Sequence, residues 1–302
     1  MEEFMVVSLK NDDLQVQFSD FGGALTSIKD KDGVEYLWQG NPDFWSGQAP
    51  VLFPICGSLR LNWTVYRPAE RPHFTGSMSR HGLVRKEYFT LDEVTDDSVT
   101  FSIKATEEML KAYPYHFELR NRYRLTGKTI RVDYLVTNHE TEKTMPYFIG
   151  GHPGFNCPLL AGENYEDYYL EFEQEETCSV PKSFPDTGLL DLQDRSPFLD
   201  RQKILGLNYD LFTQDAITLD QLKSRRVSLR SRKHDKGIRL DFEDFPYLVL
   251  WSTTNHSPFV ALEPWSGLST CLDESDYFED KRNVSLVRAG QTDSKSFAIS
   301  IL

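Results

Sequence analysis

Long runs that alternate apolar and polar side chains dominate this chain of 302 residues. Successive side chains of a β-strand point to opposite faces, so such alternation is typical of strands with one buried face. The two longest runs, residues 117–125 and 129–137, are joined at Thr126-Gly127-Lys128, which predicts a hairpin. Further predicted strands cover residues 14–18, 24–29, 34–38, 99–105, 168–172, 227–232, 237–242, 247–252, 259–262 and 296–302.

Turn signals separate these runs, and helix signals are few. Asp30-Lys31-Asp32-Gly33 predicts a tight hairpin turn, because glycine accepts a positive φ. Residues 106–112 predict a short helix that Pro114 stops. One or two helical turns are also expected at residues 189–194 and 273–278.

The chain shows no internal repeat, low-complexity linker or break in composition. An antiparallel pattern spread over the whole length favours one all-β domain over two, since β-sandwiches reach about 250 residues as single units. We therefore predict a single large antiparallel β-sandwich domain over residues 1–302, with few short helices.

Charge and composition exclude several classes of protein. With 33 Lys and Arg against 46 Asp and Glu, the net charge is −13, which disfavours nucleic acid, anionic membranes and polyanionic substrates. The longest apolar stretch, Ala49 to Cys56, is far shorter than the ~20 residues of a membrane helix. The start of the chain lacks the pattern of a secretory signal. The four cysteines form no CxxC pair, so we expect free thiols and a cytoplasmic protein.

The usual cofactor and hydrolase motifs are missing from the sequence. It has no GxGxxG, P-loop, HExxH or GxSxG pattern, so we expect neither a cofactor nor a metal. Chemistry then has to come from single residues that folding brings together. Four segments place a titratable or charged residue among Gly, Pro and aromatic residues, namely Leu52–Arg60, Ser79–Arg85, Ile149–Asn156 and Ala261–Gly267.

Each of these segments also has a plain structural interpretation. His81 fits a surface loop, and His152 fits a tight turn in which it bonds the backbone. Glu263 fits a strand-end carboxylate paired with an arginine, and Arg60 fits such a partner. Two imidazoles and a carboxylate in one set of segments, however, suit proton transfer.

The order of these segments resembles a known family. Phe-Pro…Gly-Ser-Leu-Arg, His-Gly-Leu-Val-Arg, Gly-His-Pro-Gly-Phe and Leu-Glu-Pro-Trp-Ser-Gly follow one another as in the aldose 1-epimerases, or galactose mutarotases, and most closely as in their LacX-like bacterial branch. The resemblance runs from Phe21-Gly22-Gly23 to the C-terminal strands. It implies one large antiparallel β-sandwich with a sugar cleft across a curved sheet.

The resemblance also implies roles for single residues. Glu263 matches the general base of the family, and His152 matches its general acid. His81 matches a second cleft histidine, and Arg60 matches the cleft arginine. The family also has an aspartate that binds sugar hydroxyls, for which Asp215 is the first choice.

Two assignments stay open at this point. Asp210 is the alternative to Asp215 for binding sugar hydroxyls. Trp265 suits stacking on the apolar face of a sugar ring, and it suits core packing equally well.

The function implied is the interconversion of α and β anomers of a free hexose such as galactose or glucose. A base takes the proton from O1 while an acid protonates O5, the C1–C2 bond rotates, and the ring closes on the other face. No hydride, electron or phosphoryl group moves, so no cofactor is needed. The expected partner is a small sugar, and the chain is expected to be a monomer or homodimer.

Four alternatives remain. Glu263 with Asp215 could form the carboxylate pair of a glycoside hydrolase. His81, His152 and Glu263 could form a 2-His-1-carboxylate metal site.

The other two alternatives keep a sugar ligand. A non-catalytic carbohydrate-binding protein would need no acid/base pair. A hexose-6-phosphate epimerase would use Arg80, Arg85 and Lys86, although the charge of −13 favours a neutral sugar.

Overall fold

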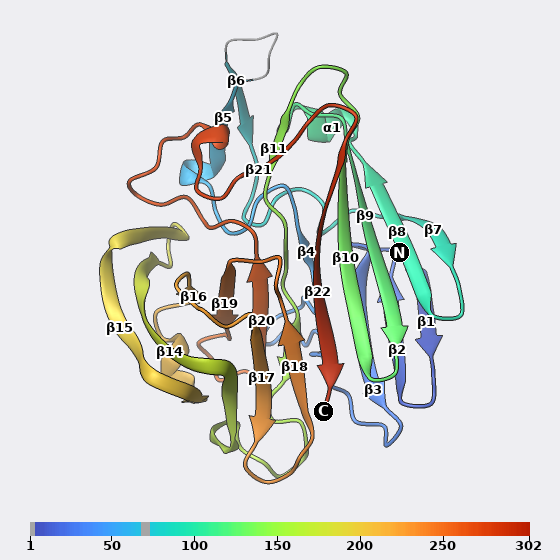
Figure 1. The fold of residues 1–302 in the computed structure, drawn as a ribbon, viewed down its shortest axis with the longest axis vertical. Helices are drawn as coiled ribbons and strands as arrows, with labels where there is room; N and C mark the ends of the chain where they lie inside the picture. Colours follow the sequence, from blue (N-terminus) through green and yellow to red (C-terminus); the bar gives the residue numbers. More distant parts are fainter. Residues whose placement is uncertain (1–3, 68–72) are drawn as a thin grey trace.

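A nine-stranded antiparallel sheet is the largest element of the structure, a computed structural model that describes residues 4–67 and 73–302. Its strand order is β15-β14-β17-β18-β22-β10-β9-β8-β7 (Figure 1). The strands are β7 (Thr90–Val94), β8 (Ser98–Lys104), β9 (Phe117–Thr126), β10 (Thr129–Asn138), β14 (Tyr168–Phe184), β15 (Leu189–Gly206), β17 (Arg226–Ser231), β18 (Gly237–Asp241) and β22 (Thr292–Ile301).

A second, six-stranded sheet has the order β16-β19-β20-β12-β4, with β13 also paired to β20. Its strands are β4 (Val51–Leu52), β12 (Gly150–Gly151), β13 (Gly154–Asn156), β16 (Ile217–Leu219), β19 (Tyr247–Trp251) and β20 (Phe259–Trp265). Smaller sheets join β1 (Val6–Lys10), β2 (Leu14–Ser19) and β3 (Ala24–Asp30), then β5 (Trp63–Tyr66) with β6 (Phe74–Ser77), and β11 (Met145–Tyr147) with β21 (Ser285–Val287).

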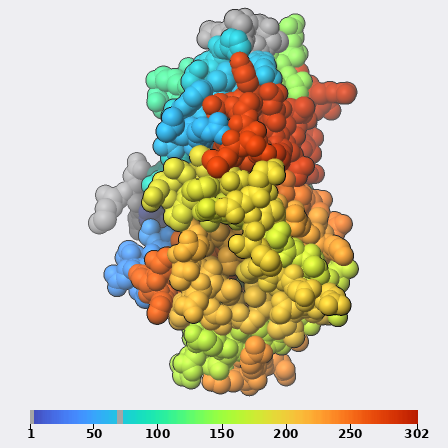
Figure 2. Space-filling model, turned by 90° about the vertical axis from the view of Figure 1, so that its left-hand side faces the viewer, coloured from blue at the N-terminus to red at the C-terminus, as the bar shows by residue number. Residues whose placement is uncertain are grey.

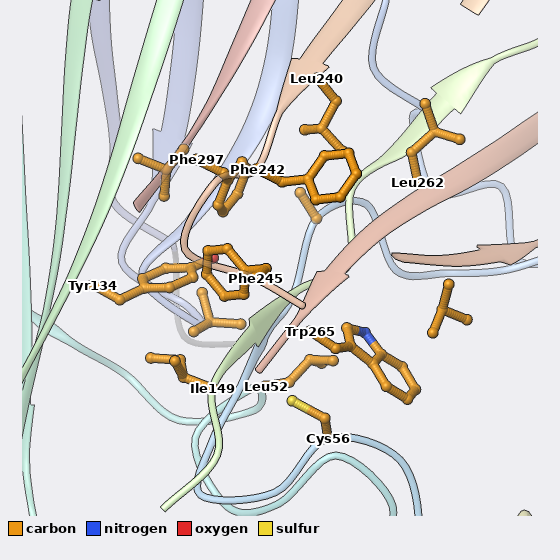
Figure 3. Close-up of a cluster of buried hydrophobic side chains, with 14 of the residues drawn as sticks. Leu52, Cys56, Tyr134, Ile149, Leu240, Phe242, Phe245, Leu262, Trp265 and Phe297 are labelled. Carbon is orange, nitrogen blue, oxygen red and sulfur yellow. The ribbon is translucent and has the colours of Figure 1, made fainter. Parts of the chain in front are cut away.

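The core lies between the two large sheets, as a close-up of buried side chains shows (Figure 3). Tyr134 of β10, Leu240 of β18 and Phe297 of β22 come from the nine-stranded sheet, and Leu262 and Trp265 of β20 come from the other. Each fully buried apolar side chain of this size contributes roughly 1.5–3 kcal/mol. The predicted antiparallel β-sandwich is therefore confirmed.

The longest hairpin follows the predicted register. Thr126 of β9 pairs with Thr129 of β10 across Gly127-Lys128, and the pairing continues to Phe117 and Asn138. Alternate residues of β9 are buried along most of its length, as the period of two requires. Most other predicted strands also coincide with observed ones.

The predicted strand at residues 34–38 is wrong. After β3 the chain makes only isolated bridges, Lys29 with Glu35 and Leu37 with Phe155. The Glu35 carboxylate accepts the backbone N–H groups of Ile28 at 2.8 Å and Leu37 at 3.1 Å. This side chain thus takes donors that a continuous ladder would have used.

One of the helix predictions is confirmed, and the one at residues 189–194 is wrong. Residues 106–112 contain α1 (Glu107–Leu110), which the Thr106 side chain caps by accepting the Met109 N–H. Residues 189–194 are instead the start of β15, because Leu190 pairs with Ser183 of β14 across a turn. Single turns of 3₁₀ helix are η1 (Arg60–Asn62), η2 (Tyr165–Asp167), η3 (Tyr209–Phe212) and η4 (Phe278–Asp280).

The predicted turn of helix at residues 273–278 is also wrong, because the described chain has a loop there before η4. Side chains hold this loop in place of a helix. The Glu274 carboxylate accepts the N–H groups of Cys271 and Arg282, both at 3.0 Å. Arg282 pairs in addition with Asp273 at 2.8 Å.

Across residues 4–67 and 73–302, the longest helices are too short to span a bilayer. The four cysteines are unpaired and buried.

Candidate active site

A carboxylate and an imidazole meet at the centre of the six-stranded sheet. Glu263 lies in the middle of β20, opposite Val249 of β19, and its side chain is only 2% exposed. His152 follows β12 directly, and its backbone N–H donates to the Pro50 carbonyl at 3.1 Å. The resulting distance between His152 Nε2 and Glu263 Oε2 is 3.3 Å.

Trp265 fixes the carboxylate from the same strand. Its Nε1–H donates to Glu263 Oε2 at 3.1 Å. The indole is buried and lies beside Leu52 and Cys56 in the core (Figure 3). It also forms part of the cavity wall. The structure thus gives Trp265 a core position and, in addition, a hydrogen bond to the proposed base.

His81 is held by the backbone of Gly57. The backbone N–H of Gly57 donates to the ring atom Nδ1 of His81 at 3.2 Å. The backbone N–H of His81 donates in return to the Gly57 carbonyl at 2.8 Å. Because Nδ1 accepts, the neutral ring carries its proton on Nε2. Gly57 has φ +70°, and a Cβ there would lie 2.0 Å from Ser269 Oγ. Glycine is therefore required beside His81.

Aromatic rings enclose His152. Trp45 stacks on its imidazole with a centroid distance of 4.7 Å, and Trp251 meets it edge-on at 5.5 Å. His81 meets it edge-on at 5.4 Å. Among the described residues, no group hydrogen-bonds the buried Nδ1 of His152. Sequence reasoning missed Trp45 and Trp251, since neither lies in a motif and only the fold brings them here.

Burial controls the protonation of the site. It raises the pKa of Glu263 well above its usual value, and the negative charge of Asp215 adds to this. Burial lowers the pKa of His152 to about 3, and the positive charge of Arg85 adds to that. Burial also lowers the pKa of His81, as do the neighbouring His152 and Arg85. Close to neutral pH, we therefore treat Glu263 and His152 as a pair that shares one proton.

These groups open onto a cavity of about 290 Å³. Figure 2 shows the face where the β14–β15 hairpin lies, with its yellow residues spread beside a hollow. Ser183, Gly188 and Leu190 of this hairpin line the cavity, as do Trp45, Pro50, Gly57, Arg80, His81, Arg85, His152, Asp215, Ala216, Thr218, Val249, Trp251, Glu263, Trp265 and Ser269.

The two candidate aspartates differ in position. Asp215 reaches the cavity from a turn between η3 and β16, with φ +75°. Asp210 lies within η3, is exposed and is not part of the lining. The structure therefore brings Asp215, and not Asp210, to Glu263 and the two histidines.

Arg60 is the one predicted site residue that the structure does not bring into the cavity. It lies in η1, where Leu61 and Asn62 have positive φ, and its guanidinium pairs with Asp276 at 3.0 Å. It also donates to the carbonyls of Cys271, Leu272 and Glu274. These partners hold Arg60 outside, and the described arginines that line the cavity are Arg80 and Arg85.

The described residues contain no group of three or more His, Cys, Asp and Glu side chains arranged to hold a metal ion. His81 already uses Nδ1 toward the backbone, and Glu263 uses Oε2 toward Trp265. What the arrangement can do is move a proton, because a carboxylate and an imidazole lie side by side, both buried, in the wall of the cavity.

The fold is an antiparallel β-sandwich, and its cavity brings a buried carboxylate within 3.3 Å of a buried imidazole. Residues 5–276 match the family model described as aldose 1-epimerase, so the chain belongs to the aldose 1-epimerase family and is an isomerase of the mutarotase type. The plasmid and chromosomal LacX proteins of Lactococcus lactis subsp. lactis are 66% and 65% identical over 298 residues, which is 99% of this chain and 100% of each relative.

Solved structures show the same likeness. A galactose mutarotase related enzyme from Lactobacillus acidophilus has a TM-score of 0.91 and 31% identity, covering 99% of this chain and 97% of that one. A galactose mutarotase-like protein from Lactobacillus casei ATCC 334 has a TM-score of 0.87 and 29% identity, covering 99% and 100%.

Proposed function

We propose that this protein interconverts the anomers of a reducing hexose such as galactose or glucose, with Glu263 as base and His152 as acid. The observation that carries the proposal is the distance of 3.3 Å between Glu263 Oε2 and His152 Nε2 at the cavity wall. O1 and O5 of a sugar are both bonded to C1. Adjacent acid and base groups can therefore serve both oxygens without moving apart.

The reaction needs one proton to enter and one to leave. Glu263 takes the proton of the O1 hydroxyl, and the C1–O5 bond breaks as His152 gives its proton to O5. Rotation about C1–C2 presents the other face of the aldehyde, and both transfers then reverse. Each positioned transfer contributes about 10²–10⁴-fold. The raised pKa of Glu263 and the lowered pKa of His152 favour the neutral pair with the shared proton on Glu263, so this proton has to pass to His152 across the 3.3 Å contact before O1 is deprotonated. In the charged form that results, the same shifts make the carboxylate a stronger base and the imidazolium a stronger acid.

Other lining groups would orient the sugar. The Nε2–H of His81, fixed by the bond from Gly57 to Nδ1, would donate to an oxygen that gains negative charge. Asp215 would accept hydroxyl protons, and the indoles of Trp45 and Trp251 offer apolar faces. The lining extends from Trp45 to Ser269, which supports the prediction of a single domain.

Polarimetry on fresh α-anomers of galactose and glucose tests the proposal. The wild type should speed the decay of optical rotation, and Glu263→Gln should lower kcat by about 10²–10⁴-fold. Glu93→Gln, at an exposed position on β7, is the matched control and should keep the wild-type rate. No acceleration by the wild type would refute the function. Sugar binding without acceleration would instead favour a non-catalytic module.

A further inference from the structure

Among the described residues, two arginines line the cavity, Arg80 and Arg85, and one of them has no counter-charge. Arg85 is half-buried, and its guanidinium makes no hydrogen bond or ion pair with any residue in the described part of the chain. Arg80 donates Nε–H to Ser58 Oγ at 2.9 Å. Its nearest carboxylate oxygen, Asp215 Oδ2, lies 4.0 Å from NH1, which is a loose ion pair.

The charges of the cavity sum to a positive value. Glu263 and His152 share one proton and cancel, His81 is neutral, and Asp215 offsets one of the two arginines. The lining therefore carries a net charge of about +1, although the chain as a whole carries −13. A partly desolvated guanidinium without a counter-charge is costly, so the position of Arg85 in the cavity wall points to a ligand that supplies one.

The residues around Arg80 restrain its guanidinium, whereas those around Arg85 do not. Gly188, at the tip of the β14–β15 hairpin, packs so closely that a Cβ would lie 2.5 Å from Arg80 NH2 and 2.4 Å from Ser58 Oγ. The hairpin and Ser58 thus hold Arg80 against the wall. Arg85 has no such restraint, and its five N–H donors are available to a planar or tetrahedral anion.

We propose that the substrate of this site is a hexose that carries an anionic group, a phosphate or a carboxylate, and that Arg85 binds this group with Arg80 beside it. This inference rests on the proposed mutarotase function and deepens it. It reverses the preference for a neutral sugar that the overall charge suggested, because the local charge of the cavity acts on a bound ligand at short range.

The test compares anomer exchange, followed by NMR, for galactose and glucose, for their 6-phosphates and for the corresponding uronates. The wild type should show a kcat/KM about 10–100-fold higher for at least one anionic class than for its neutral parent, as expected for a charge-assisted hydrogen bond. The 6-phosphate and uronate arms distinguish a phosphate from a carboxylate as the anion.

Variants then assign the preference to Arg85. Arg85→Gln should lower the ratio of anionic to neutral kcat/KM toward 1, and Arg85→Lys should keep part of it, since the charge remains while the planar fork is lost. Arg124→Gln, an exposed position on β9, is the control and should leave the ratio unchanged.

Three outcomes would overturn the inference. Equal use of neutral and anionic sugars by the wild type would do so while leaving the mutarotase function intact, and this comparison needs no variant to fold. An unchanged ratio in folded Arg85→Gln, with all rates reduced together, would show a purely structural role. Acceleration of none of these sugars would refute the inference together with the proposed function.

Discussion

Replacing Gly57 by alanine tests how the backbone holds His81. Gly57 has φ +70°, a region that costs an L-residue about 1–2 kcal/mol. The new Cβ would lie 2.0 Å from Ser269 Oγ, and relieving such overpacking costs about 1–3 kcal/mol more. The free energy of unfolding should therefore fall by about 2–5 kcal/mol in Gly57→Ala.

The change should also reach the active site. Gly57 donates to His81 Nδ1 and accepts from the His81 N–H, so a shift of its peptide moves the imidazole. A displacement near 1 Å costs about 10²-fold in rate. Urea denaturation measures the stability, and polarimetry measures kcat.

A second substitution separates the two costs. Ser269→Gly removes the Oγ and Cβ atoms that a Cβ at Gly57 would meet, at the loss of the hydrogen bond from the Ser58 N–H. The double variant should thus be about 1–3 kcal/mol more stable than the sum of the single effects predicts. Additive effects, or a Gly57→Ala variant as stable as the wild type, would refute the steric reasoning.

The remaining predictions concern the buried pair. Burial raises the pKa of Glu263, so the folded chain holds a proton there that the unfolded chain loses above about pH 4.3. The wild type therefore loses stability as pH rises above this value. The Tm of Glu263→Gln minus the Tm of the wild type should thus grow from pH 4 to 8. A constant difference in calorimetry would contradict this. Because the pKa of His152 is lowered to about 3, the unfolded chain takes up a proton there below about pH 6.5 and the folded chain does not. The wild type therefore loses stability as pH falls, and His152→Gln should gain Tm relative to it from about pH 6.5 to 4, which a pH-independent difference would contradict. Trp45→Leu should admit water, raise the pKa of His152 in an NMR titration and lower kcat about 10-fold. An unmoved pKa would show that the stacked ring does not exclude water.

Much of the fold could be predicted because it depends on local alternation. The β9–β10 hairpin needs only a period of two and a turn residue with positive φ, and Gly127 supplies φ +52°. The β14–β15 hairpin could not be predicted in the same way. Its pairing shifts register at several points, among them between Glu171 and Glu176, which erases the alternation. Leu189 and Leu190 then resemble one turn of a helix, although they pair across the hairpin.

The predicted site residues also divide into those whose position the sequence predicts and those whose position it does not. Glu263 and His152 could be found because each stands in a segment of unusual composition, and the structure places them in contact. Arg60 stands in such a segment too, but three carbonyls and Asp276 capture its guanidinium. Which partners a long side chain finds depends on loops distant in sequence, and these follow no periodic pattern.

The charge of the chain illustrates why a global property misleads about a site. Most of the excess acidic residues lie on the surface, where water and salt screen them beyond about 8–10 Å. Inside the cavity, Arg85 acts on both histidines and lowers the pKa of each. The same guanidinium that favours an anionic group on the sugar therefore also makes the His152 imidazolium a stronger acid. If an anion neutralises Arg85 on binding, the pKa of His152 rises, and the proton it needs for O5 becomes easier to hold. Substrate charge and acid catalysis would then be coupled through one residue.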